Sequence, residues 1–173
     1  MKANHVLMTL VLLLASQWTW AQNWESGTQK TNSFYNYSSG NARYSKTEVW
    51  YDISTESDGK MEFGTTPLGA VAVDGIGLYA VVDDELIWVT GGGESLVAED
   101  IAAGSYRVRI TGRPTDKNGH GGNFVASYVL IPAEYVNDPE PNDTWERAYG
   151  IKSGNLQKGH LGYKRGKYTD LQD

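Results

Sequence analysis

The chain has 173 residues, with 21 acidic against 15 basic side chains, a net charge of −6 and no cysteine. A net negative chain repels phosphate backbones, so nucleic acid is not expected as a partner. Without cysteine there can be no disulfide and no thiolate metal site, so packing or bound ions must stabilise the fold outside a cell.

The first 21 residues have the pattern of a signal peptide. Lys2 and His5 precede an apolar run from Val6 to Ala15, and Thr19-Trp20-Ala21 places small residues where a signal peptidase reads them. We therefore expect cleavage before Gln22 and a secreted protein that is extracellular, on the cell surface or periplasmic. An uncleaved signal anchor is the alternative. No later stretch approaches the roughly twenty apolar residues that span a bilayer, so no membrane span is predicted.

Residues 22–45 are rich in Asn, Ser, Gly, Thr and Tyr and show no sustained period. This composition predicts an irregular segment or a loosely held edge strand. Aromatic side chains in such a polar segment have no obvious place in a core, so they are candidates for stacking on a sugar ring or a peptide. These candidate ligand-binding residues are Trp24, Tyr35, Tyr37 and Tyr44. Packing over the edge of the fold is the alternative role for them.

Two β-hairpins are predicted after this segment. In the first, alternating residues from Glu48 to Ser54 and from Lys60 to Thr65 flank a Ser57-Asp58-Gly59 turn. In the second, the apolar runs Leu78–Val82 and Leu86–Thr90 flank the acidic turn Asp83-Asp84-Glu85. The spacing of strands and turns is typical of an all-β protein.

Three more strands follow the hairpins, at Ser95–Ala98, Gly104–Ile110 and Phe124–Ile131. In the middle one, Arg107 and Arg109 share the face opposite the apolar side chains. No helical period competes, so residues 46–132 are predicted to form an antiparallel β-sandwich. The aromatic residues expected between its two sheets are Trp50, Phe63, Tyr79, Trp88, Tyr106 and Tyr128. The loop before the last strand is expected to hold a turn at Asp116–Gly119 and a solvent-exposed His120.

The end of the chain repeats an earlier pattern. Residues 167–173, Lys-Tyr-Thr-Asp-Leu-Gln-Asp, can be laid over residues 43–49, and the chain stops where the next residue would match Trp50. Residues 133–173 are therefore predicted to be a linker and the truncated start of a second β-sandwich.

Several motifs, taken in order, resemble the bacterial pre-peptidase C-terminal domain. They are Glu-Val-Trp-Tyr from residue 48, Ser-Asp-Gly-Lys-Met-Glu-Phe from 57, Leu-Tyr-Ala-Val-Val-Asp from 78, Ile-Ala-Ala-Gly-Ser-Tyr-Arg-Val-Arg-Ile from 101 and Ala-Ser-Tyr-Val-Leu from 126. The resemblance covers residues 46–130. Residues 137–148 with 159–163 are similar to the opening segment of another such domain.

The resemblance implies a jelly-roll-like sandwich without catalytic residues, of the kind appended to secreted peptidases and other extracellular proteins. In some members the domain binds protein or carbohydrate, and acidic residues of the opening segment bind calcium. Carried over to this chain, the calcium ligands would be Glu140, Asn142, Asp143, Asp170 and Asp173. The residues themselves leave a second interpretation, in which 138–143 is a stiff acidic linker that caps a short helix.

No catalytic constellation accompanies these features. The chain has no His-Glu-x-x-His helix and no Gly-x-Ser-x-Gly elbow, and its carboxylates at 83–85, 94 and 99 stand in predicted turns. We expect a non-catalytic secreted module of a larger exported protein, serving adhesion, targeting or stabilisation through an extracellular protein or polysaccharide. The alternatives are an accessory part of a secreted peptidase or other hydrolase whose catalytic domain is not in this chain, and a purely structural spacer.

Overall fold

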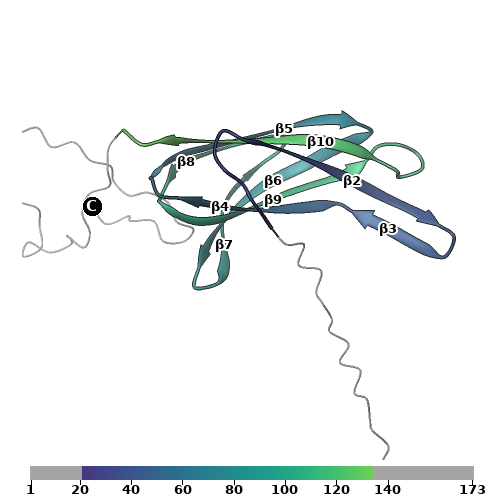
Figure 1. Cartoon of the computed structure of the whole chain (residues 1–173), viewed down its shortest axis with the longest axis horizontal. Coiled ribbons are helices and arrows are strands. Elements are labelled where there is room, and N and C mark those ends of the chain that lie inside the picture. Colours follow the sequence, from purple (N-terminus) through teal and green to yellow (C-terminus); the bar gives the residue numbers. More distant parts are fainter. Residues whose placement is uncertain (1–20, 135–173) are drawn as a thin grey trace, which may run out of the picture.

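The structure, a computed structural model, describes residues 21–134, which form two facing β-sheets (Figure 1). The first sheet has the strand order β1 (Gln22–Asn23), β4 (Glu48–Thr55), β9 (Gly104–Pro114), β6 (Val71–Val82), β7 (Glu85–Gly92). The second sheet has the order β3 (Ala42–Lys46), β2 (Gln29–Ser39), β10 (Gly122–Pro132), β5 (Gly59–Gly69), β8 (Ser95–Ile101). Neighbouring strands are antiparallel except for the short parallel pair of β1 and β4. The predicted antiparallel β-sandwich is confirmed.

The first predicted hairpin is wrong, because β4 and β5 belong to different sheets. Between them the chain makes a corner that crosses the sandwich. Thr55 Oγ1 donates a hydrogen bond to the carbonyl of Ser57 at 2.8 Å, and the Asp58 carboxylate accepts one from the Ala103 amide at 2.6 Å. The predicted turn residues therefore fasten this corner to the start of β9. Two strands of alternating apolar and polar residues on either side of a turn can pair with each other in a hairpin, or they can belong to the two facing sheets of a sandwich. The sequence pattern could not distinguish these two arrangements.

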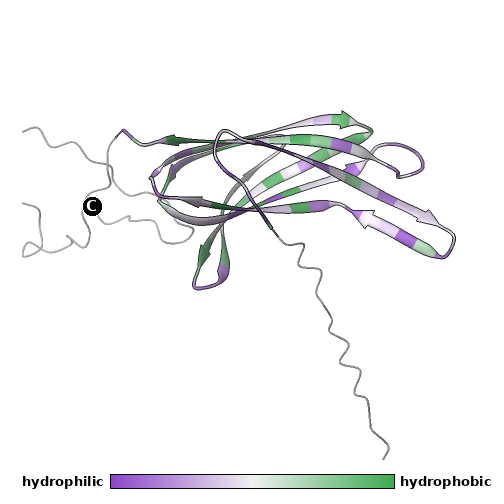
Figure 2. Cartoon of the chain, viewed as in Figure 1, coloured by the Kyte–Doolittle hydropathy of each residue, from purple (hydrophilic) through white to green (hydrophobic). Residues whose placement is uncertain are grey.

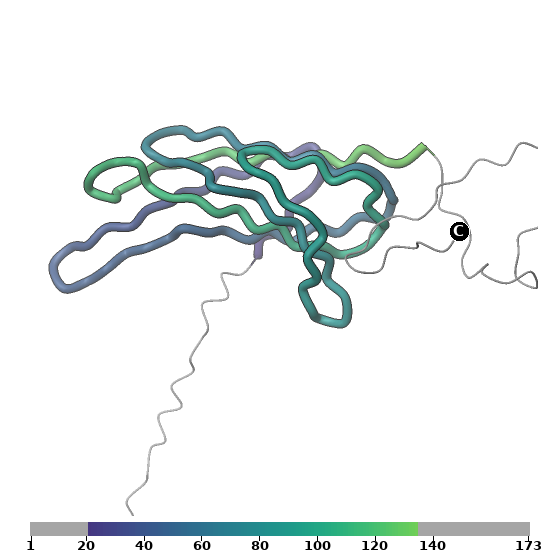
Figure 3. The backbone as a smooth tube through the Cα atoms, turned by 180° about the vertical axis from the view of Figure 1, so that it is seen from behind, coloured from purple at the N-terminus to yellow at the C-terminus, as the bar shows by residue number. Residues whose placement is uncertain are grey.

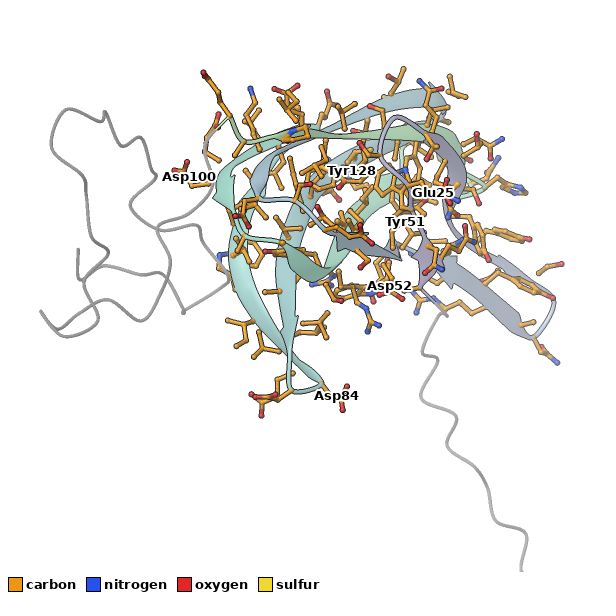
Figure 4. The ribbon with its side chains drawn as sticks, turned by 60° about the vertical axis from the view of Figure 1, so that its left-hand side comes forward. Glu25, Tyr51, Asp52, Asp84, Asp100 and Tyr128 are labelled. Carbon is orange, nitrogen blue, oxygen red and sulfur yellow. The ribbon has the colours of Figure 1, made fainter. Side chains whose placement is uncertain are left out.

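The second predicted hairpin, β6–β7, is confirmed. Val82 pairs with Glu85, which leaves Asp83 and Asp84 as a two-residue turn. Both turn residues have positive φ, 52° and 64°, as a type I′ turn requires and as Asp tolerates better than most residues. The hairpin projects from the body of the sandwich, as the reverse view shows (Figure 3), and Asp84 lies at its tip (Figure 4).

The core fills the space between the sheets, and inward-facing residues alternate with more exposed ones along β4, β9 and β10. Figure 2 shows the hydropathy of each residue along the strands. Phe63, Tyr106 and Tyr128 are buried there, as predicted. The largest other aromatic side chains in the core are Trp24, Phe34, Tyr51 and Phe124. Tyr51 and Tyr128 are labelled between the sheets in Figure 4.

Three of the predicted core aromatics, Trp50, Tyr79 and Trp88, lie instead on the outer face of the first sheet. Trp88 is 54% exposed, and the other two are half-buried. The reason is the period of two along a strand: Trp50 shares its face with Glu48 and Asp52. Turning Trp50 inward would bury both carboxylates, which costs more than leaving one indole half in water.

The predicted irregular segment at 22–45 is wrong for β2, which is an eleven-residue strand held between β10 and β3. The expectation of an edge strand holds for β3. In β2 the one fully buried side chain is that of Phe34, stacked on Phe124 with ring centroids 4.5 Å apart. A strand with a single buried residue and a polar outer face carries no clear alternation in its sequence.

Residues 1–20 and 135–173 lie outside the described part, and with them most of the predicted signal peptide and the predicted second copy. Within residues 21–134, no helix has the length and apolar character needed to cross a membrane.

Burial of Tyr128 gives the fold a testable pH dependence. Desolvation raises the pKa of Tyr128 to about 12, above the value of about 10 in an unfolded chain. The folded state therefore holds this proton more tightly. The stability that this pKa difference contributes is fully present below pH 10 and is lost as the pH rises through 12.

Urea unfolding of the wild type should accordingly show a falling free energy between pH 9 and pH 11.5. In Tyr128→Phe, which keeps the ring stacked on Phe63 at 5.1 Å, the fall should be shallower. Equal slopes for the two proteins would contradict this assignment.

Candidate functional site

An aromatic row crosses the outer face of the first sheet and takes one side chain from each of four neighbouring strands. Trp50 on β4 and Tyr79 on β6 have ring centroids 5.5 Å apart, and Tyr79 meets Trp88 on β7 edge-to-face at 5.2 Å. Arg109 on β9 lies between these strands, with its guanidinium carbon 5.5 Å from the centre of the Trp50 ring, which is the range of a cation–π contact. The three rings contact one another in order across the sheet, inclined by 45° between Trp50 and Tyr79 and by 77° between Tyr79 and Trp88.

Beside this row lies an open cleft of about 430 Å³, a size typical of ligand sites. Its lining residues are Gly75, Ile76, Gly77, Tyr79, Trp88, Gly91, Gly92, Arg109 and Thr111. Two of these glycines, Gly77 and Gly91, lie opposite each other across β6 and β7. Because they carry no side chain, the backbone itself forms a glycine floor on which the Trp88 ring lies, and Tyr79 and Arg109 line the cleft beside that ring.

Trp88 is fitted onto this glycine floor. A Cβ placed on Gly91 would come within 2.5 Å of the indole, and one on Gly77 within 2.9 Å. Any larger residue at either position would push the ring away. The edge contact with Tyr79 holds the ring from the side. The indole is therefore held in place before any ligand arrives, although 54% of the residue is in water.

The charges on this face are paired. Arg109 donates through Nε to Glu48 at 2.9 Å, Arg107 donates to Asp52 at 2.8 Å, and on the more exposed end of β9 Arg113 pairs with Asp74. Figure 4 labels Asp52 on this side of the molecule.

Glu48 and Arg109 adjust each other's pKa. Partial burial raises the pKa of Glu48, but hydrogen bonds from Trp50 and Arg109 outweigh it, and the net pKa lies below its usual value. The hydrogen bond to Glu48 raises the pKa of Arg109. Both groups remain charged at neutral pH, so the face keeps its compensated charge there.

The alternation of charged residues on two strands indicates the position of this site. Arg107 and Arg109 were correctly predicted to face away from the core, and they pair in register with Asp52 and Trp50. Placing the strand with alternating acids beside the strand with alternating arginines would have put Trp50 on the same outer face.

A second aromatic surface gathers three of the predicted ligand residues. Tyr37 stacks on Tyr44 across the β2–β3 hairpin at 5.1 Å and on His120 at 4.9 Å, with Tyr35 6.0 Å away on the same strand. Tyr44 is 45% exposed. The binding role predicted for Tyr35, Tyr37 and Tyr44 stays a prediction, and packing against His120 gives them a structural role as well.

The loop that carries His120 is built on Asp116. The Asp116 carboxylate accepts hydrogen bonds from the amides of Gly121 at 2.7 Å, His120 at 3.0 Å and Asn118 at 3.2 Å. These bonds, that from Gly121 foremost, lower the pKa of Asp116. The predicted turn and the exposed position of His120 are both confirmed.

Trp24, the fourth predicted ligand residue, has a different role. Only 3% of it is exposed, and its ring meets Tyr51 at 4.6 Å, Tyr128 at 5.7 Å and Phe63 at 6.0 Å. A ring enclosed in this way cannot stack on a ligand, so the prediction of a ligand-binding Trp24 is wrong. Trp24 packs the beginning of the N-terminal segment into the core.

Comparisons with known proteins give a similarity among solved structures alone. No protein-family model matches the chain, and no curated protein matches it. Among solved structures, the chain is similar to the pre-peptidase C-terminal domain of the collagenase from Bacillus anthracis, with 12% identity and a TM-score of 0.42. The match covers 62% of this chain and 93% of that one. At this identity and TM-score, membership of that family stays a prediction of the sequence motifs.

The predicted calcium ligands, Glu140, Asn142, Asp143, Asp170 and Asp173, lie outside the described residues. Within residues 21–134, no group of three or more His, Cys, Asp or Glu side chains could hold a metal ion. The calcium site stays a prediction about the C-terminal segment.

Proposed function

We propose that this chain is exported and that its β-sandwich is a non-catalytic module that binds an extracellular polymer, protein or polysaccharide, through the cleft beside Trp88. The module would thereby target or attach the rest of its protein to that polymer. The observation that carries the proposal is the held but exposed Trp88 ring above the glycine floor.

The Trp88 ring is unusual because it is exposed and yet held by its neighbours. An exposed tryptophan normally costs free energy in water and side-chain entropy when it is immobilised. Here the contacts with Gly77, Gly91 and Tyr79 already restrict the ring. A ligand that stacks on Trp88 gains apolar contact at a smaller entropic cost, which is the general route to affinity by preorganisation.

The proposal predicts that Trp88→Ala loses binding and keeps its fold. The test is co-sedimentation of the purified protein with insoluble cellulose, chitin, peptidoglycan sacculi and collagen fibrils. We expect binding to at least one of these, and a loss of about thirty-fold in Trp88→Ala, the result of removing an interface hot spot of about 2 kcal/mol. The free energy of unfolding should change by about 1 kcal/mol or less, because most of the side chain is in water.

Leu68→Ala is the matched control. Leu68 is 57% exposed, nearly the same as Trp88, but lies on the second sheet. This variant should bind like the wild type. The proposal is wrong if the wild type binds none of the four polymers, or if Trp88→Ala and Leu68→Ala bind equally well.

A further inference from the structure

We infer that the ligand of the Trp88 cleft is an uncharged polysaccharide. This inference rests on the proposed function and narrows it to one class of polymer. It follows from three properties of the cleft: the charge of its lining residues, its aromatic side chains and its size.

The paired charges make acidic polymers poor ligands for this cleft. Of the residues that line the cleft, Arg109 is the one with a permanent charge, and Glu48 already neutralises it. The two neighbouring arginines are neutralised in the same way, by Asp52 and Asp74. A polyanion would have to displace these carboxylates to reach a guanidinium, and the net charge of −6 repels it at longer range.

The paired groups can still recognise hydroxyls. A guanidinium has five N–H donors, and Glu48 accepts from two of the three nitrogens of Arg109. The Thr111 hydroxyl lines the same cleft and is bound at 3.3 Å to the carbonyl of Gly75, a long contact. Arg109 can donate hydrogen bonds, and Thr111 can donate or accept them, while the charges stay compensated. This suits a ligand rich in neutral hydroxyl groups.

The aromatic side chains that line the cleft suit a ligand with a sugar ring, which has apolar faces. A pyranose presents C–H groups on its two faces and hydroxyls around its edge, so it can stack on an indole and hydrogen-bond sideways at the same time. Trp88 supplies the stacking ring, and Arg109 and Thr111 lie on the same outer face of the sheet. Tyr79 and Trp50 extend the aromatic row across the sheet, so further sugar units of a chain would meet further rings.

The size favours a polysaccharide over a folded protein. A stable protein–protein interface buries about 800 Å² on each partner and some twenty residues a side. Nine residues and about 430 Å³ form this cleft, which matches a short run of sugar units. An extended polypeptide is the nearest competitor, and it forms a separate arm of the test.

The test is affinity electrophoresis of the purified protein in native gels, each containing one soluble polymer. The uncharged polymers are hydroxyethylcellulose, galactomannan, glucomannan and arabinoxylan; the acidic ones are polygalacturonate and alginate; gelatin is the polypeptide. We expect retardation by at least one uncharged polysaccharide, with an affinity at least ten-fold weaker in Trp88→Ala. Trp88→Tyr keeps a ring and should recover part of the loss, and Leu68→Ala should migrate like the wild type.

Each other outcome overturns the inference. Retardation by polygalacturonate or alginate alone, or by gelatin alone, would show a different ligand class and leave the proposed binding function in place. Retardation that is equal in Trp88→Ala would move the site elsewhere. If no gel retards the protein, the uncharged-polysaccharide assignment is wrong, and the co-sedimentation assay decides separately whether the module binds a polymer at all. A thermal melt of each variant verifies that it is folded.

Discussion

Trp24→Ala is expected to destabilise the fold by about 3–5 kcal/mol, the usual cost of removing a fully buried tryptophan. The Trp24 ring contacts three core aromatics contributed by both sheets, Tyr51 from the first and Phe63 and Tyr128 from the second. Deleting it leaves a cavity that these rings cannot close without losing their own contacts. The measurement is chemical unfolding followed by far-UV circular dichroism, or, if the variant does not fold, by a protease-resistance assay against the wild type.

Trp50→Ala is the matched control for this prediction. It removes the same side chain from the outer face of the neighbouring strand, where Trp50 is half-buried. We expect it to cost about 1 kcal/mol. If Trp24→Ala were as mild as Trp50→Ala, Trp24 would not be a core residue, and its predicted ligand role would return.

Gly112→Ala is expected to cost about 3 kcal/mol, although it adds a single methyl group. A Cβ on Gly112 would lie 2.2 Å from Cε2 of Phe34 and 2.4 Å from the carbonyl oxygen of Ala72. Neither neighbour can move easily: Phe34 is fully buried against Phe124, and Ala72 belongs to a strand paired with β9. Overpacking of a closed core at this level is costly.

Gly69→Ala provides the comparison for this substitution. Its new Cβ would have its nearest neighbour at 3.6 Å, an ordinary contact, and the position is exposed near the end of β5. The free energy of unfolding should change by less than about 0.5 kcal/mol. Equal effects of the two substitutions would mean that backbone flexibility, and not crowding against Phe34, explains the glycine at 112.

The strands were predictable where apolar and polar residues alternate over one buried face. This was so for β9 and β10. The β6–β7 hairpin was predictable from its two apolar runs and its Asp83-Asp84 turn. The prediction failed for β2, where Phe34 is the one buried side chain. The pairing of strands depends on contacts between residues far apart in the sequence, which the local pattern does not contain. For this reason the corner at Asp58 was predicted to be a hairpin turn.

The site was missed because large aromatic residues were assigned to the core by their size. Trp24 stands in a polar segment and is buried, whereas Trp88 stands in an apolar strand and is exposed. The register of the whole strand decides the face of each residue, and for Trp50 the flanking Glu48 and Asp52 decided it. No charged residue flanks Trp88 in the same way. Its position depends on the pairing of the glycines of β6 with those of β7, and the sequence pattern did not predict that pairing.

The measurement that tests the central claim most directly is NMR chemical-shift mapping on the ¹⁵N-labelled protein, with cellohexaose, xylohexaose and mannohexaose added in turn. If the cleft binds an uncharged glycan, one of them should shift the Trp88 indole N–H and the amides of Gly77, Gly91 and Gly92, while the buried Trp24 indole stays unchanged. Shifts confined to Tyr37, Tyr44 and His120, or no shift near Trp88 with any of the three, would contradict it.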